Sequence, residues 1–224
     1  MRPCLFALSL LFSLATAHAS EYPAFDPQKL LITQESPGGK SFSMNLSYLD
    51  QTIDELTRHA INYPPRFDTP QDRQRAIADL KNLCNVLDVL LKDHTGDKEY
   101  LLRSGLLHIM AYNLDIPGSN EKTMAIFQRL LALSPDDPLS NNHYGIFLTF
   151  SQRPKEGLPF LEKAAAGGIK EARSTMGMAY LILGDKTRAL ESLERYQKDN
   201  PDDNQNNILI NSLRNGKIEF ETKP

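Results

Sequence analysis

The side chains that could do chemistry in this chain are few and do not group into a catalytic pattern. Four histidines follow Ala19 in the sequence: His59, His94, His108 and His143. No two of them lie four positions apart around a glutamate, as the zinc-binding pattern of metalloproteases requires. No serine stands in a nucleophile-elbow pattern, and Gly38-Gly39-Lys40 lacks the rest of a phosphate-binding loop. We therefore expect no catalytic residue, no cofactor and no metal site.

Three pairs of adjacent carboxylates could in principle support acid–base catalysis: Asp54-Glu55, Asp136-Asp137 and Asp202-Asp203. The last two pairs precede expected helices, where negative charge meets the positive end of the helix dipole. Helix capping is therefore the interpretation that we adopt for them. An enzymatic alternative stays open, in which the protein is an accessory subunit or a hydrolase. Its site would lie in the N-terminal helical region, which contains His59 and His94.

Helical periodicity dominates the sequence from Leu46 onward, and no strand pattern competes with it. Short polar residues that suit helix N-caps stand before several of the helical segments: Thr69, Ser119, Asp137 and Asp185. Gly184 suits the left-handed residue that ends a helix. The sequence predicts an all-α fold with about four antiparallel helix pairs and a C-terminal capping helix. That last helix, from Asn207 to Leu213, is expected to expose Asn206, Asn207 and Asn211.

Two stretches of the chain repeat one another. Gly145 and Gly177 stand at equivalent positions, and their separation is close to the roughly 34-residue period of a helix–turn–helix repeat. At three aligned positions the residues agree in type: bulky Leu148 and Tyr180, small Gly157 and Ala189, and large Leu161 and Leu193. A unit of this kind cannot bury its apolar face alone, so successive units must stack into a solenoid.

These residues resemble the tetratricopeptide repeat (TPR) family, with repeats at about 104–137, 138–169 and 170–203. The repeats and the capping helix occupy residues 97–224, and residues 46–96 form an N-terminal helical pair that fits the pattern only in its helical period. The resemblance implies a TPR-like α-solenoid whose concave groove binds a protein or peptide partner. The protein is thus expected to be a protein–protein interaction scaffold rather than an enzyme.

Two narrower likenesses accompany the main one. The junction Ala164-Ala165-Ala166-Gly167-Gly168 is similar to Sel1-like repeats, which share the solenoid fold. The segment from Asn141 to Leu148 is similar to part of the TPR proteins of type IV pilus assembly. This second likeness extends the expected function to envelope or pilus assembly.

In the repeat register, nine side chains fall on the face of the first helices that lines the groove: His108, Tyr112, Asn142, His143, Ile146, Thr149, Arg173, Ser174 and Met178. Amides, a tyrosine and a methionine make an adaptable surface that can bond a peptide backbone and pack its side chains. For each residue the alternative is packing against the next repeat. The lysine and asparagine set with which some TPR proteins clamp a C-terminal carboxylate is not evident.

Residues 1–19 have the pattern of a secretory signal peptide. A basic residue, Arg2, precedes an apolar run, and Ala17-His18-Ala19 fits a cleavage site, so the mature chain would begin at Ser20. The apolar run is too short to span a bilayer, and no stable membrane insertion is expected. The protein would be exported, to the periplasm in a Gram-negative bacterium or otherwise secreted. Residues 20–45 form either an extended arm or a short hairpin, with disorder as a third alternative.

Charge and cysteine content narrow the partner class. The net charge is −3, which gives no reason to expect nucleic-acid binding. Cys84 is the only cysteine after the signal peptide and lies on an apolar helical stripe, so a small buried hydrophobe is expected rather than a reactive thiol. The oligomeric state is open, and self-assembly through the last helix is an alternative to partner binding.

The position of Gly177 inside a predicted helix leads to an expectation about the stability of the protein. A glycine inside a helix costs roughly 1 kcal/mol relative to alanine, which suggests a packing reason for its presence. At the crossing of two paired helices a larger side chain would overpack. Gly177→Leu is therefore expected to lower the melting temperature, and Gly177→Ala to be nearly neutral or stabilising.

Overall fold

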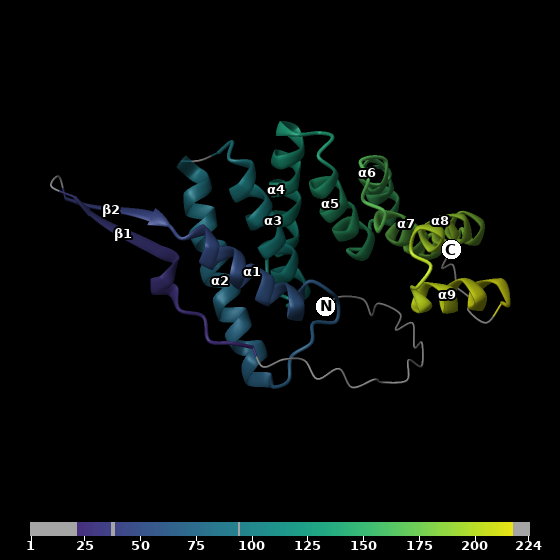
Figure 1. Ribbon diagram of the computed structural model, residues 1–224, viewed down its shortest axis with the longest axis horizontal. Helices are drawn as coiled ribbons and strands as arrows, with labels where there is room; N and C mark the ends of the chain where they lie inside the picture. Colours follow the sequence, from purple (N-terminus) through teal and green to yellow (C-terminus); the bar gives the residue numbers. More distant parts are fainter. Residues whose placement is uncertain (1–21, 37–38, 94, 217–224) are drawn as a thin grey trace.

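The computed structural model describes residues 22–36, 39–93 and 95–216. Within these ranges the chain forms a short hairpin and nine α-helices, which confirms the all-α expectation. The bounds are η1 Pro27–Leu30, β1 Leu31–Ser36, β2 Gly39–Met44, α1 Leu46–Ala60, α2 Pro70–Asp93, α3 Lys98–Asn113, α4 Ser119–Leu133, α5 Pro138–Phe150, α6 Pro154–Ala166, α7 Ala172–Ile182, α8 Lys186–Asp199 and α9 Asn204–Arg214. Helices α1 and α2 lie at the end of the molecule that carries the hairpin, and the pairs from α3–α4 onward follow one another along its length (Figure 1).

Local capping explains where most helices begin. Asp137 and Asp185 accept backbone amide hydrogen bonds at the starts of α5 and α8, and Thr69 does so at the start of α2. Ser119 was expected to cap α4, and this was wrong. The N-cap is Gly118, in a left-handed conformation with φ 79°. Ser119 is then already the first helical residue, and its hydroxyl donates to a loop carbonyl at 2.8 Å.

Glycines let the paired helices cross closely. A Cβ built at Gly145 of α5 would lie 2.7 Å from Cγ of Leu161 in α6. A Cβ at Gly177 of α7 would lie 2.6 Å from Cγ of Leu193 in α8. Both leucines are fully buried, so neither can move aside freely. The repeated glycine–leucine contact fixes α5–α6 and α7–α8 as equivalent pairs.

Helices α3 and α4 also cross closely at a glycine, but this glycine stands at a different position of the repeat. A Cβ at Gly105 would lie 2.8 Å from two ring carbons of Phe127. The interval from Gly105 to Gly145 is longer than the interval from Gly145 to Gly177, so the repeat pattern does not identify Gly105. The crossing of α3 and α4 therefore has the same cause as the other two, a lack of space for a Cβ, although the interval between the glycines differs.

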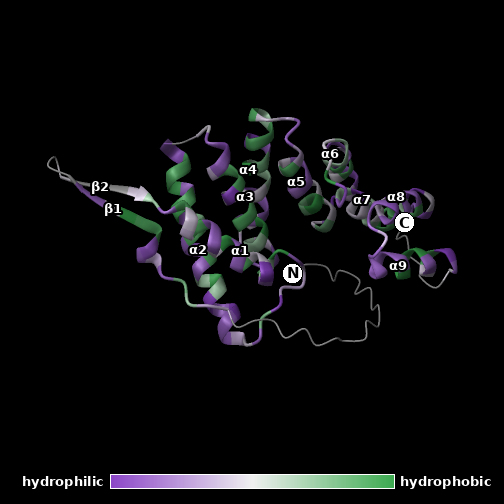
Figure 2. Ribbon diagram, in the orientation of Figure 1, coloured by the Kyte–Doolittle hydropathy of each residue, from purple (hydrophilic) through white to green (hydrophobic). Residues whose placement is uncertain are grey.

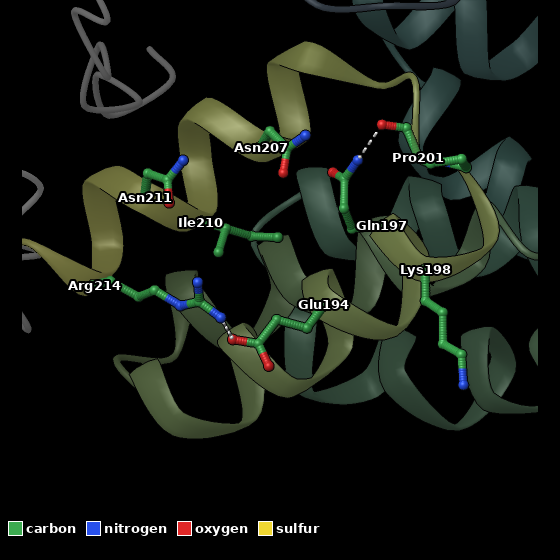
Figure 3. Close-up of a pocket in the computed structure, with 8 residues that line it drawn as sticks. All are labelled: Glu194, Gln197, Lys198, Pro201, Asn207, Ile210, Asn211 and Arg214. Carbon is green, nitrogen blue, oxygen red and sulfur yellow. Dashed lines mark hydrogen bonds and ion pairs between the residues drawn. The ribbon is translucent and has the colours of Figure 1, made fainter.

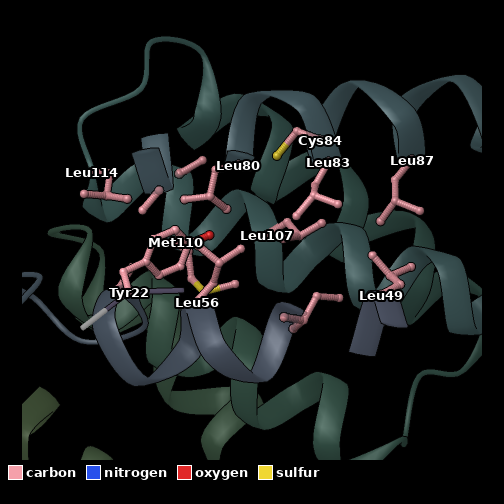
Figure 4. Packing of buried hydrophobic residues seen from close by; sticks show 14 of the residues in the cluster. Tyr22, Leu49, Leu56, Leu80, Leu83, Cys84, Leu87, Leu107, Met110 and Leu114 are labelled. Carbon is pink, nitrogen blue, oxygen red and sulfur yellow. The ribbon is translucent and has the colours of Figure 1, made fainter. Parts of the chain in front are cut away.

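The N-terminal helices are joined in another way. Both α1 and α2 pack against α3. The three helices share one apolar cluster, which includes Leu56, Leu83 and Met110 (Figure 4). Neither α1 nor α2 contains a glycine, so neither offers the small position that the later pairs use at their crossings.

Tyr22 connects the elements of this N-terminal cluster. Its side chain is only 2% exposed. The hydroxyl donates to the carboxylate of Asp79 in α2 (3.0 Å), and the Tyr22 carbonyl accepts from Arg75 (3.0 Å). The ring lies edge-on to His59 of α1 and to Phe67, with centroids 5.7 and 6.2 Å away. The N-terminal segment therefore straps α1, α2 and the loop between them together.

Strands β1 and β2 pair in an antiparallel hairpin that points away from the helices (Figure 1). Its register pairs Leu31 with Met44 and Ser36 with Gly39. Leu31 is 55% exposed and Ile32 is also exposed; Figure 2 shows this hydrophobic stretch at the base of β1. Of the two structured alternatives for residues 20–45, the part of the chain that the structure describes thus contains the hairpin, preceded by the Tyr22 segment.

The last helix differs in one detail from the sequence expectation. Asn207 is partly exposed and Asn211 is exposed, but Asn206 is buried. The Asn206 amide donates to the Leu193 carbonyl (3.1 Å) and to the side chain of Gln197 (2.6 Å). The expectation that Asn206 faces solvent was wrong because its amide ties α9 to α8.

Two further expectations concern membranes and export. No helix in the described ranges is long and apolar enough to cross a bilayer. The expected signal peptide, residues 1–19, lies outside the described residues.

The geometry at Gly177 changes the expected effect of alanine. Because even a Cβ would meet Leu193, Gly177→Ala should destabilise the protein by about 1–2 kcal/mol, despite a helix-propensity gain of about 1 kcal/mol. Urea denaturation measures the loss. Gly96→Ala is the control, since nothing lies within 4 Å of a Cβ there. In a Leu193→Ala background the alanine should cost less, and an equal cost would contradict the proposed contact.

Tyr22 generates a second stability prediction. Tyr22→Ala should lower the free energy of unfolding by about 3 kcal/mol, because it empties a fully packed aromatic position. Tyr22→Phe should lose only about 1 kcal/mol, the contribution of the hydrogen bond to Asp79. Chemical denaturation of both variants separates the two effects. A Tyr22→Ala protein as stable as the parent would show that the segment is not a structural strap.

Candidate partner-binding surface

The expected partner-binding residues belong to α3, α5 and α7, the first helices of three successive pairs. Gly145 and Gly177 mark the sides of α5 and α7 that face their paired helices. Residues about a third of a turn or more away from these glycines lie on the remaining sides. We call the side chains of α3, α5 and α7 that point away from α4, α6 and α8 the A-helix face.

Three of the expected residues are buried: His108, Asn142 and Thr149. Nδ1 of His108 lies 2.8 Å from the Ser104 carbonyl and donates to it, and burial lowers the pKa of the imidazole. The Thr149 hydroxyl donates to the Gly145 carbonyl at 2.8 Å. The side-chain oxygen of Asn142 is buried and has no hydrogen-bond partner among the described residues. These three side chains therefore face the interior and do not form an open surface.

Three others occupy equivalent positions and pack toward the following repeat: Tyr112, Ile146 and Met178. The ring of Tyr112 lies edge-on to Phe147 of α5, with centroids 5.3 Å apart. Ile146 packs against the cluster that includes Ala172 of α7. Met178 packs against the cluster that includes residues of α9. All three remain partly exposed, so they join the repeats and still contribute to the A-helix face.

The remaining three residues of the expected set are partly exposed: His143, Arg173 and Ser174. Burial lowers the pKa of His143, and the carboxylate of Asp137 opposes this effect. Arg173 forms an ion pair with Asp199 of α8, with 2.5 Å between nitrogen and oxygen. The structure thus brings six of the nine expected residues to partly exposed positions along α3, α5 and α7.

Sequence reasoning missed the exposed apolar residues at the C-terminal ends of α5 and α7. Phe150 is 43% exposed and Ile182 is 48% exposed. Each follows Ile146 or Met178 by four positions and so lies on the same side of its helix. The interval between Phe150 and Ile182 equals the interval between Gly145 and Gly177. The repeat period was therefore the signal that could have identified them.

Three hollows on the described part of the surface lie away from the expected groove. One, of about 370 Å³, lies between α8 and α9 and includes the Glu194–Arg214 ion pair, 2.8 Å long (Figure 3). A second lies between α2 and α4. A third is lined by residues of the N-terminal segment and α1, among them Phe25 and Tyr48. None of these three hollows is lined by a residue of the expected groove.

The enzymatic alternative placed a site near His59 and His94. His59 is buried, stacks on Phe67 with centroids 5.2 Å apart, and has Nδ1 3.0 Å from the Arg66 carbonyl. These contacts give it a packing role, whereas His94 lies outside the described residues. Within the described ranges, no group of three or more histidine, cysteine and carboxylate side chains could hold a metal ion. Burial raises the pKa of the Cys84 thiol to about 12, so it is protonated at neutral pH.

The burial of His108 predicts how stability depends on pH. The pKa of His108 is lowered in the folded state, so at mildly acidic pH the unfolded chain binds more protons than the folded one. Stability is then complete above the unfolded pKa of about 6.5 and falls as the pH drops below it. The free energy of unfolding should decrease between pH 7.5 and pH 5 by up to about 1.4 kcal/mol per pH unit for this histidine. Urea titrations of His108→Gln should show a shallower decrease, and an unchanged slope would contradict the assignment.

Comparisons with known proteins agree with the solenoid. No protein-family model matches the chain. A crystal structure of MamA superposes on this chain with a TM-score of 0.56 at 17% identity, covering 75% of this chain and 84% of that one. A thermophilic TPR protein of Thermus thermophilus has a TM-score of 0.52 at 15% identity, covering 75% and 92%.

One curated relative also matches part of the sequence. The human aspartyl/asparaginyl beta-hydroxylase is 21% identical over 126 residues, which is 56% of this chain but only 16% of the length of that protein. This similarity is confined to a small part of the hydroxylase. Together with the glycine crossings of successive helix pairs, the structural similarities show that this chain has the α-solenoid fold of TPR proteins.

Proposed function

We propose that the protein is a binding scaffold that holds a protein or peptide partner on its A-helix face. One observation carries the proposal: large apolar side chains, Phe150 and Ile182, are exposed at equivalent positions of two successive repeats. Isolated exposed apolar residues are common on protein surfaces. Exposed apolar residues that recur with the period of the fold form a row, and such a row is suited to binding a partner.

The geometry suggests the form of the partner. Helices α5 and α7 contact one another, and packed helices lie about 8–10 Å apart. An extended chain advances about 3.3 Å per residue. A segment with two apolar residues three positions apart would therefore place one on Phe150 and the other on Ile182. The partly exposed Ile146 and Met178 would widen each contact.

Polar groups beside this row can orient the bound segment. His143 and Ser174 are partly exposed on α5 and α7, and both side chains can donate to a peptide carbonyl or accept from a peptide amide. Arg173 pairs with Asp199 of α8, so it points toward the paired helix and lies outside the A-helix face. The proposed interaction thus combines apolar anchors with adaptable hydrogen bonding.

The proposal includes a location. The signal-peptide pattern of residues 1–19 supports export, and we place the binding function in the bacterial envelope, with pilus assembly as one pathway that would use it. The scaffold role itself is non-enzymatic and needs no cofactor.

Site-specific photocrosslinking tests the binding surface. A photoreactive phenylalanine analogue at position 150 should crosslink a partner in cells of the source organism, whereas the same analogue at the exposed Glu162 of α6 should not. Adding Ile182→Ser to the position-150 protein should reduce the crosslinked product at least threefold while the helical circular-dichroism signal is retained. Equal crosslinking from both positions, or no effect of Ile182→Ser, would contradict the proposal that the A-helix face binds the partner.

A further inference from the structure

A groove between α2 and α4 is separate from the A-helix face. It has a volume of about 570 Å³. Each helix lines it with a stripe of side chains at helical spacing: Asn85, Asp88, Val89 and Lys92 from α2, and Lys122, Ala125, Ile126 and Arg129 from α4. Each stripe spans seven residue steps, which is about 10 Å along a helix. The groove can therefore receive about two helical turns, or about three residues of an extended chain.

The base of this groove is apolar. Leu91 and Ile126 are buried there, whereas Val89 is 59% exposed. Val89 has the highest exposed fraction among the large apolar side chains of the described residues. Val89 belongs to the α2 stripe that faces Ile126 across the groove, so it is not an isolated apolar residue on a polar surface. An apolar side chain of a bound segment would cover it.

The rim of the groove is positively charged. Lys92, Lys122 and Arg129 line it, with Asp88 as the only carboxylate among the lining residues. Lys122 is paired with Asp88 at 2.6 Å. Arg129 donates to the Thr95 carbonyl at 2.8 Å and forms no ion pair with a carboxylate among the residues that the structure describes. Lys92 is exposed and has no ion pair within the described ranges. Two cationic groups thus remain available beside an apolar base.

We propose that the groove between α2 and α4 is a second docking site, and that its occupant is an acidic segment of a partner protein with an apolar anchor residue. The anchor would cover Val89, and carboxylates on either side of it would pair with Lys92 and Arg129. Complementary charge would give the site its specificity and would make binding sensitive to salt. A basic segment would meet two uncompensated cations and would be excluded.

The second site would allow the scaffold to bridge two proteins. It draws its lining residues from α2 and α4, whereas the A-helix face draws on α3, α5 and α7. A partner on one set of residues does not occupy the other. The inference also stands apart from the proposed function, since variants at Phe150 or Ile182 leave the groove residues unchanged.

Fluorescence anisotropy with short labelled peptides tests the proposal on the full mature protein. One probe carries a central leucine flanked by glutamates, and its matched probe carries lysines in their place. The glutamate probe should bind at least tenfold more tightly than the lysine probe at low salt. Its affinity should fall at least tenfold in the Lys92→Glu/Arg129→Glu variant, and at least threefold in Val89→Ser.

A matched control separates the groove from net charge. Lys155→Glu/Lys186→Glu changes the net charge by the same amount at exposed sites on α6 and α8, and it should bind the glutamate probe as the parent does. Equal binding of the two probes, no binding at millimolar concentration, or equal losses in the two charge variants would overturn the proposal. Light scattering in which Lys92→Glu/Arg129→Glu converts a dimer into a monomer would overturn it in favour of a contact between copies of the chain.

Discussion

The close approach of paired helices at glycine is the constraint on which the rest of the solenoid depends. At Gly105, Gly145 and Gly177 the space that a Cβ would need is taken by the side chain of the partner helix. The contact in α5–α6 is reciprocal, since a Cβ at Gly157 would lie 2.8 Å from the Gly145 carbonyl oxygen. These crossings fix how the helices of the pairs α3–α4, α5–α6 and α7–α8 are rotated about their axes. They thereby decide which side chains face the next repeat and which face outward.

The N-terminal helices show how two helices are held together where no glycine crossing is present. Neither α1 nor α2 has a glycine, and the two helices are held together through α3 and Tyr22. The strap supplies a buried ring and two hydrogen bonds at a junction without a close crossing. The position of Tyr22 also explains the packing role of His59, because the His59 ring contacts the rings of both Tyr22 and Phe67.

The rotation of the helices at these crossings provides the A-helix face, whereas the groove between α2 and α4 involves one helix, α2, that has no glycine. With Gly145 and Gly177 turned toward α6 and α8, Phe150 and Ile182 are left on the outer side of α5 and α7. On the other helices of the row, Val89 and its cationic neighbours are left between α2 and α4. A solenoid buries each repeat against its neighbours and keeps both sides of the row accessible. A scaffold that holds two partners is consistent with that architecture.

The sequence alone determined the elements of this protein. Apolar residues at helical spacing predicted the helices, and Asp137, Asp185 and Gly184 predicted where several of them begin or end, because capping and left-handed termination are local properties of the chain. The repetition around Gly145 and Gly177 predicted the solenoid. Only the tertiary structure decided which side chains are exposed. Asn142 and Thr149 are buried while Phe150 is open, and Asn206 turns inward to α8. The helical pattern of a sequence predicts on which side of its own helix a residue lies. How deeply the residue is buried depends on how closely the neighbouring helices approach.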